Sequence, residues 1–284
     1  MGMIQPARRG LRSPAKRLWA MIRWRRFSFN ESPPIFGNSK PKSGSHLLLQ
    51  ILEGMTRILP YAYVAADPVR TIRKTGGRRP EDEILADLQA TPRGVIGWGY
   101  VEATPKVRAF LCAPGRVNYF LFRDPRDLLV SQVYYATDLR EDHGMHALYS
   151  ALPDFAARLD IAITGIDRDG LKMVSVLQRY DAVLEWLKQP GVLCIRYEDL
   201  VDAPAVALEH MLMEIEKAGH QLAVERKAAV RTLQQFIQPQ RSATFRAGKT
   251  GTWREHFTEK HKSLFREVAG DLLQKLGYEE GSDW

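Results

Sequence analysis

The residues of this sequence that are best suited to chemistry form one short segment rich in lysine, serine and glycine. The segment reads Pro41-Lys42-Ser43-Gly44-Ser45-His46, and an apolar run follows it. The glycine allows a tight turn, and the first amides of a helix that begins here have no partner inside that helix. Such amides and the helix dipole attract a phosphate or sulfate group. Lys42 adds a positive charge and the two serines add hydroxyl donors. The segment therefore predicts an anion-binding site.

The elements around this segment alternate between strands and helices. Residues 117–122 and 192–197 are mainly apolar, as expected of strands buried on both faces of a parallel sheet, and shorter strands are expected before Pro41 and at 95–100. Helices are predicted at 46–59, at 81–89 and from Thr104 to about Cys112, on apolar spacing and on the Thr-Pro start of the last one. This order predicts an α/β fold with a central, mostly parallel sheet flanked by helices.

Three more polar clusters lie near the predicted strand ends or near the C-terminus. Arg123-Asp124-Pro125-Arg126-Asp127 follows the strand at 117–122, and Ser131 comes eight residues after Arg123. An arginine fork with a hydroxyl suits a phosphate group. Tyr197-Glu198-Asp199-Leu200 ends the strand at 192–197, and the third cluster, 245–254, reads Phe-Arg-Ala-Gly-Lys-Thr-Gly-Thr-Trp-Arg. Ligands bind at the carboxyl ends of the strands in such sheets, so these clusters are expected to share one site.

Together, in this order, the four segments resemble the PAPS-dependent sulfotransferases over about residues 35–257. PAPS is 3′-phosphoadenosine 5′-phosphosulfate, the sulfate donor of that family, and PAP is the product left after transfer. The order Pro-Lys-Ser-Gly-Ser is similar to the family's 5′-phosphosulfate loop. It differs from the nucleoside-triphosphate loop, in which glycine and lysine stand directly before the serine or threonine. This difference disfavours the alternative of a P-loop kinase that depends on ATP and Mg²⁺.

The resemblance implies a P-loop-like sulfotransferase fold and a set of donor-site residues. The expected set is Lys42, Ser43, Gly44, Ser45 and His46 at the 5′ end, Arg123 and Ser131 at the 3′-phosphate, and Tyr197, Thr232, Arg246, Ala247 and Gly248 around the nucleotide. The implied reaction moves a sulfuryl group from PAPS to a hydroxyl or amine, with Lys42 stabilising the leaving phosphate. The family needs no metal, and none is expected here.

Members of the family usually have a catalytic histidine after the second strand, and alignment of residues 95–100 puts Trp98, which accepts no proton, at that position. Either the alignment is shifted, or another residue is the base, or the protein does not catalyse. Glu102 is the nearest carboxylate and a candidate base. His46 is a second candidate, although its place at the helix start favours donor binding. A protein that binds PAPS or PAP without catalysis is the alternative. The acceptor stays open between carbohydrate, phenol and lipid; His143, His146 and the aromatic residues Trp98, Tyr100, Tyr134, Tyr135 and Tyr149 are candidates to line its pocket.

The net charge of +8 belongs to the first 30 residues, which contain eight cations and no acid. Subtracting these eight from the 41 lysines and arginines leaves 33, which balance the 33 acidic residues. Residues 1–30 are therefore treated as an extension of a domain at 31–284. The extension suits peripheral contact with an anionic membrane, a transit peptide, or a solvated segment that packs its aromatic residues on the domain. Any nucleic-acid binding would be non-specific.

Cys112 and Cys194 are the two cysteines and form no disulfide framework, which favours a reducing, cytoplasmic location.

Overall fold

A five-stranded parallel sheet with the order β2-β3-β1-β4-β7 forms the centre of the computed structural model, which describes residues 14–69, 77–139, 141–168, 170–241 and 248–284. Its strands are β1 (Ile35–Ser39), β2 (Tyr63–Val69), β3 (Val95–Tyr100), β4 (Val117–Phe122) and β7 (Leu193–Arg196). The α/β class and the parallel sheet are confirmed, and the four strands expected from the sequence lie within about one residue of their predicted places.

Of the five strands in the central sheet, β2 is the one that the sequence pattern did not reveal. Its residues include Asp67-Pro68, and both residue types are depleted in strands. β2 lies at the edge of the sheet and pairs with β3 alone, where a missing backbone N–H can be tolerated. Position in the sheet therefore outweighs local preference.

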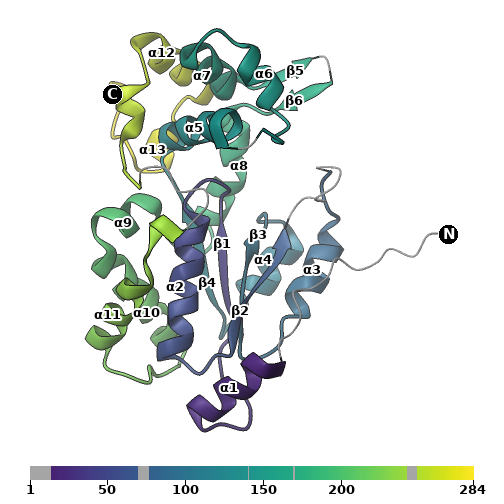
Figure 1. The fold of residues 1–284 in the computed structure, drawn as a ribbon, viewed down its shortest axis with the longest axis vertical. Helices are drawn as coiled ribbons and strands as arrows, with labels where there is room; N and C mark the ends of the chain where they lie inside the picture. Colours follow the sequence, from purple (N-terminus) through teal and green to yellow (C-terminus); the bar gives the residue numbers. More distant parts are fainter. Residues whose placement is uncertain (1–13, 70–76, 140, 169, 242–247) are drawn as a thin grey trace, which may run out of the picture.

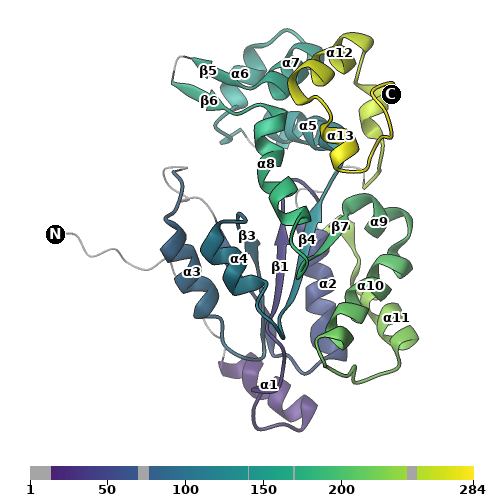
Figure 2. The same ribbon diagram turned by 180° about the vertical axis from the view of Figure 1, so that it is seen from behind.

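Helices cover both faces of the sheet, as Figures 1 and 2 show from opposite sides. One apolar core joins α2 (Ser45–Ile58), α10 (Pro204–Lys217) and α11 (Arg226–Phe236) to alternate strand residues such as Tyr119 and Leu121. The other joins α3 (Glu81–Gln89), α4 (Pro105–Leu111) and α8 (Val176–Leu187) to Phe120 and Phe122. Successive residues of β4 therefore pack into opposite cores, which explains why the strand is buried at every position.

A second group of helices lies beyond the carboxyl ends of the strands, in the upper half of Figure 1. It contains α5 (Pro125–Tyr134), α6 (His146–Ala151), α7 (Phe155–Thr164), α12 (Glu259–Ala269), α13 (Leu272–Lys275) and the hairpin of β5 (Ile166–Arg168) and β6 (Leu171–Met173). A π-helical turn at Tyr135–Leu139 extends α5, and α9 (Tyr197–Asp202) follows β7. This group forms a wall opposite the strand ends.

The basic extension contains α1 (Pro14–Trp24), which lies at the other end of the sheet, where the strands begin (Figure 1). Only part of its aromatic content packs on the domain. Phe29 is fully buried, whereas Trp19 is 72% exposed and Phe27 is 97% exposed. The expectation of a segment that packs its aromatic residues inward is therefore wrong for these two. None of the helices in the described ranges is long and apolar enough to cross a membrane.

Candidate functional site

A cavity of about 1260 Å³ lies between the carboxyl ends of the strands and the helical wall. It gathers residues that are far apart in the sequence. Several residues of the site predicted from the sequence line this cavity, namely Lys42, Gly44, Ser45, His46, Glu102, Arg123, Ser131, Tyr197 and Gly248. Thr232 is not among the lining residues; it donates to Ala228 O within α11. Arg246 and Ala247 lie outside the described residues.

The loop between β1 and α2 has the geometry of an anion cradle. Lys42 and Gly44 both have positive φ angles, 71° and 86°, so the backbone amides turn inward. A Cβ on Gly44 would lie 2.4 Å from Cδ2 of Tyr197, so both the turn and the close approach require glycine. Ser43 is fully buried and its Oγ has no hydrogen-bond partner. Buried hydroxyls are normally paired, so this atom fits an added phosphate oxygen.

Lys42 lines the cavity and contacts an aromatic ring of the helical group. Its Nζ is 3.6 Å from the centroid of the Tyr135 ring, a cation–π contact. Tyr135 begins the π-helical turn and also lines the cavity. This contact holds the ammonium group inside the cavity, against a ring that also lines it.

Arg123 leaves the end of β4 and points into the same cavity. Its side chain is 10% exposed and its Nε has no hydrogen-bond partner. The guanidinium carbon lies 4.5 Å from the centroid of the Tyr197 ring, and one terminal nitrogen donates to Lys249 O at 3.1 Å. Ser131 lines the cavity from α5, so an arginine and a hydroxyl face one space. This is the arrangement that a phosphate group requires.

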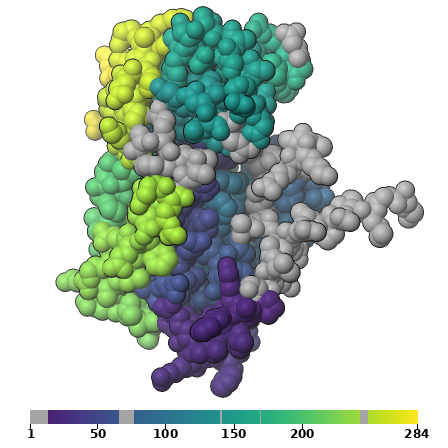
Figure 3. Space-filling model, viewed as in Figure 1, coloured from purple at the N-terminus to yellow at the C-terminus, as the bar shows by residue number. Residues whose placement is uncertain are grey.

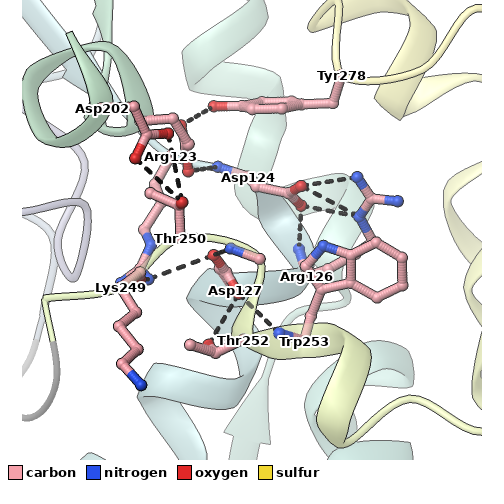
Figure 4. A network of polar contacts seen from close by, with 12 residues as sticks. Arg123, Asp124, Arg126, Asp127, Asp202, Lys249, Thr250, Thr252, Trp253 and Tyr278 are labelled. Carbon is pink, nitrogen blue, oxygen red and sulfur yellow. Dashed lines mark hydrogen bonds and ion pairs between the residues drawn. The ribbon is translucent and has the colours of Figure 1, made fainter.

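Asp127 ties Arg123 to the segment that follows Gly248 (Figure 4). The carboxylate is fully buried and accepts hydrogen bonds from Gly251 N at 2.8 Å, Thr252 Oγ1 at 2.9 Å and Trp253 N at 2.8 Å. It also pairs with Arg123 at 3.4 Å. Asp127 belongs to the sequence motif at 123–127, but the motif alone assigns no role to it. Its spacing from Arg123, one helical turn, is the signal that was available.

Replacement of Asp127 with alanine is expected to lower the free energy of unfolding by about 3–5 kcal/mol, because the buried arginine and three further donors lose their acceptor. Urea denaturation measures this change. Asp202→Ala is the matched control: that carboxylate is exposed and accepts a long hydrogen bond from Thr250 Oγ1, at 3.3 Å, so the change in stability should be less than about 0.5 kcal/mol. Equal stability of the two variants would contradict the role given to Asp127.

A second buried network fixes the start of α5. Asp124 caps the helix by accepting from Arg126 N at 2.8 Å, and the Arg126 guanidinium binds both Asp124 and Glu279. Glu198 accepts from Asp124 N at 3.2 Å and from Tyr278 Oη at 2.7 Å. The two motifs at 123–127 and 197–200 are thus joined below the cavity.

Glu102, and not Trp98, faces the cavity after β3. Trp98 packs against the α2 core, with its Nε1 buried and without a hydrogen-bond partner. The side chain of Asn38 binds both backbone groups of Val101 at 3.0 Å and so extends the strand pairing to the residue before Glu102. Glu102 is 16% exposed and pairs with Arg78, which also lines the cavity. The residue after β3 that offers a carboxylate to the cavity is therefore Glu102.

Tyr100 is a hydrogen-bond donor in this cavity. Burial raises the pKa of its phenol, a hydrogen bond with Ser45 opposes the rise in part, and the nearby Tyr135 adds to it. The phenol consequently stays protonated at neutral pH and cannot serve as a base there.

The other acceptor-side predictions divide between cavity and core. His143 lines the cavity and contacts the Tyr135 ring edge-on, at 5.7 Å between centroids. His146 bonds instead to Ala136 O at 2.8 Å, and Tyr149 is fully buried. Trp98, Tyr134, His146 and Tyr149 are not among the lining residues. Lys40, Arg78, Lys172, Arg179 and Asp181 line the cavity without having been predicted.

Comparisons with known proteins agree with this geometry. The chain matches the family described as Sulfotransferase domain over residues 119–277, a range that contains Arg123, Ser131 and Tyr197 and begins after the loop at 41–46. Mouse sulfotransferase SULT7A1, solved with PAP, superposes with a TM-score of 0.55 at 19% identity over 88% of this chain and 86% of that one. Retinol dehydratase, solved with androsterone and inactive cofactor PAP, gives 0.53 at 14% identity, over 87% and 83%.

A comparison with curated protein sequences gave no significant match. The match to the family covers more than half of the 284 residues, and the two solved structures share the fold. The chain therefore belongs to the sulfotransferase domain family.

Proposed function

We propose that this protein transfers the sulfuryl group of PAPS to a hydroxyl or amine of an acceptor and releases PAP. The observation that carries the proposal is a pair of buried donor atoms without hydrogen-bond partners, Ser43 Oγ in the loop at 41–46 and Arg123 Nε after β4. Arg123 lines the cavity, and so do the neighbours of Ser43 in the loop, Lys42 and Gly44. The two donor atoms belong to two anion-binding groups, one suited to each phosphorylated end of PAPS. The presence of PAP in both solved relatives supports this choice of ligand.

The proposed donor site follows the two groups. The 5′-phosphosulfate is bound by Lys42, Ser43, Gly44, Ser45 and His46, and the 3′-phosphate by Arg123 and Ser131. Tyr197 and the loop of Arg246, Ala247 and Gly248 complete the nucleotide site. The Asp127 network positions both Arg123 and the end of that loop.

The proposed chemistry is an in-line displacement at sulfur. The acceptor oxygen or nitrogen attacks, the bond from sulfur to the bridging oxygen breaks, and its electron pair goes to the 5′-phosphate of PAP. Lys42 and the loop amides neutralise the charge that grows on that phosphate. Glu102 receives the acceptor proton, because it is the carboxylate on the cavity wall after β3, where Trp98 faces the core.

We propose a polar acceptor, in which carbohydrate is favoured over phenol or lipid. The cavity wall outside the donor groups contains Arg78, Glu102, Lys172 and Asp181 among its lining residues. An apolar acceptor would remove these charges from water without replacing their hydrogen bonds, which is costly. A molecule with many hydroxyl groups would replace them.

Calorimetric titration with PAP and with 5′-AMP tests the donor site. Wild type should bind PAP much more tightly than 5′-AMP. Arg123→Ala should weaken PAP binding by roughly tenfold to a hundredfold, since a hydrogen bond to a charged group contributes about 1.5–3 kcal/mol. Its affinity for 5′-AMP should be almost unchanged.

Arg231→Ala, an exposed arginine on α11 that is not among the cavity-lining residues, is the control and should bind PAP like wild type. Failure of folded wild-type protein to bind PAP would contradict the proposed function.

A PAPS- or PAP-binding protein without turnover is the second candidate, and the position of Trp98 favours it. Incubation with ³⁵S-labelled PAPS and a panel of glycans, phenols and sterols separates the two. Tight PAP binding without labelled product from any class would favour the binding protein.

We further propose that residues 31–284 form the catalytic domain and that residues 1–30 contact a membrane peripherally. A cytoplasmic location is proposed on the ground that Cys112 and Cys194 are both free thiols.

A further inference from the structure

Helix α1 has two apolar faces, and only one of them is covered. Ala20 is buried toward the domain, where Arg17 donates to Arg93 O at 3.0 Å and lies 5.4 Å from the Phe29 ring. On the other side Leu18 is 59% exposed and Ile22 is 61% exposed, one helical turn apart. Trp19 lies beside them on the helix surface. Packing on the domain explains the first face and leaves the second unexplained.

The uncovered face is unusual for this molecule. Of the large apolar residues exposed within the described ranges, Leu18, Trp19, Ile22 and Phe27 are four of eight, and they include both aromatic ones. The other four are scattered singly over the surface, which is ordinary. Leu18, Trp19 and Ile22 lie on α1 and Phe27 follows three residues after its end, so four exposed apolar side chains occur within ten residues of sequence. Such a concentration of exposed apolar side chains is of the kind that marks an interaction site.

The surroundings of these four side chains are strongly basic. Residues 14–30 contain Lys16, Arg17, Arg23, Arg25 and Arg26 and no acid. Arg23 donates to Arg57 O, and burial together with the positive charge of Arg57 lowers the pKa of Arg23, so the basic area continues onto α2. Glu31 pairs with Arg26 and is the first acid after the helix.

We propose that α1 docks on an anionic lipid bilayer, with Leu18, Trp19, Ile22 and Phe27 inserted at the headgroup boundary. Charge complementarity selects this occupant: arginine and lysine bind the anionic headgroups while the aliphatic and aromatic side chains enter the acyl region. A nucleic acid would satisfy the cations and leave Leu18 and Ile22 in water. The proposal does not depend on catalysis.

Docking would also orient the cavity. α1 lies at the end of the sheet where the strands begin (Figures 1 and 2). The residues that line the cavity include Lys40, Arg123 and Tyr197, which follow the carboxyl ends of β1, β4 and β7. In the space-filling view the purple segment that contains α1 forms one end of the molecule (Figure 3). A membrane at that end leaves the cavity on the aqueous side. Together with the proposed function, this favours an acceptor that reaches the site from solution.

Flotation of the full chain with vesicles tests the docking. At low salt, wild type should float with phosphatidylcholine vesicles that contain about 30% phosphatidylserine and should bind pure phosphatidylcholine vesicles much more weakly. Binding to the anionic vesicles should weaken as the salt concentration rises. The double substitution Trp19→Ala with Ile22→Ala should lower partitioning by about tenfold or more. Arg25→Gln with Arg26→Gln should lower it by roughly tenfold or more, since each cation contributes about 1 kcal/mol.

Leu139→Ala with Val206→Ala is the matched control, because these exposed apolar residues lie at the end of the π-helical turn and on α10, outside α1, and it should float like wild type. Unchanged thermal unfolding and PAP affinity verify that each variant is folded. Wild-type protein that stays in the supernatant at low salt overturns the proposal, and so does equal flotation of the Trp19 and Ile22 variant. A wild-type dimer that this variant converts to a monomer would assign the face to a second copy, and displacement of vesicles by poly(U) would assign it to nucleic acid.

Discussion

Replacement of Glu102 with glutamine should lower kcat by about 10²–10⁴, the contribution of a positioned general base. Glutamine has nearly the same size and accepts no proton at neutral pH. The affinity for PAP should change by less than about threefold, because the proposed donor contacts are made by the loop at 41–46 and by Arg123. The acid-side fall of the wild-type pH–kcat profile should disappear in the variant, which a purely structural role would not produce.

Arg78→Gln is the control for the ion pair that Glu102 makes. It removes the partner of Glu102 and leaves the carboxylate in place. A loss as large as that of Glu102→Gln would mean that the pair, and not proton transfer, is what matters. Activity of Glu102→Gln within about threefold of wild type would remove Glu102 from the mechanism and direct the same test to His46.

Replacement of Lys42 with alanine should lower kcat by roughly 10²–10³ or more, the effect of losing one electrostatic donor to a developing negative charge. Lys42 belongs to the loop proposed to bind the 5′-phosphosulfate, and its ammonium lies in the cavity 3.6 Å from the Tyr135 ring centroid. Single-turnover assays with labelled PAPS would separate this effect on chemistry from any effect on binding.

Lys249→Ala provides the comparison, because Lys249 also lines the cavity and contacts Arg123 through its backbone carbonyl, which the substitution keeps. Loss of the Lys249 ammonium should weaken PAP binding with little change in kcat. Activity of Lys42→Ala unchanged to within about threefold would exclude the proposed role of Lys42. If the Glu102 and Lys42 variants both retain PAP binding and wild type shows no turnover, the second candidate function is the better account.

Much of the fold follows from local sequence patterns. The strand at 117–122 is buried at every position and mainly apolar because its residues alternate between two cores, and the helix at 45–58 repeats its apolar residues at helical spacing. The shape of the loop at 41–46 was predictable for a similar reason. The lysine, the glycine that allows a positive φ and the start of α2 all lie within this one short segment.

Tertiary structure decided the features that depend on contacts between distant residues. β2 is a strand because β3 offers an edge to pair with, although Asp67-Pro68 opposes it locally. Asp127 matters because a loop more than a hundred residues later donates to it. Glu102 reaches the cavity through the pairing of Asn38 with Val101, while Trp98 turns to the core. Sequence spacing determines which elements form, but burial and hydrogen bonding between elements determine which side chains meet.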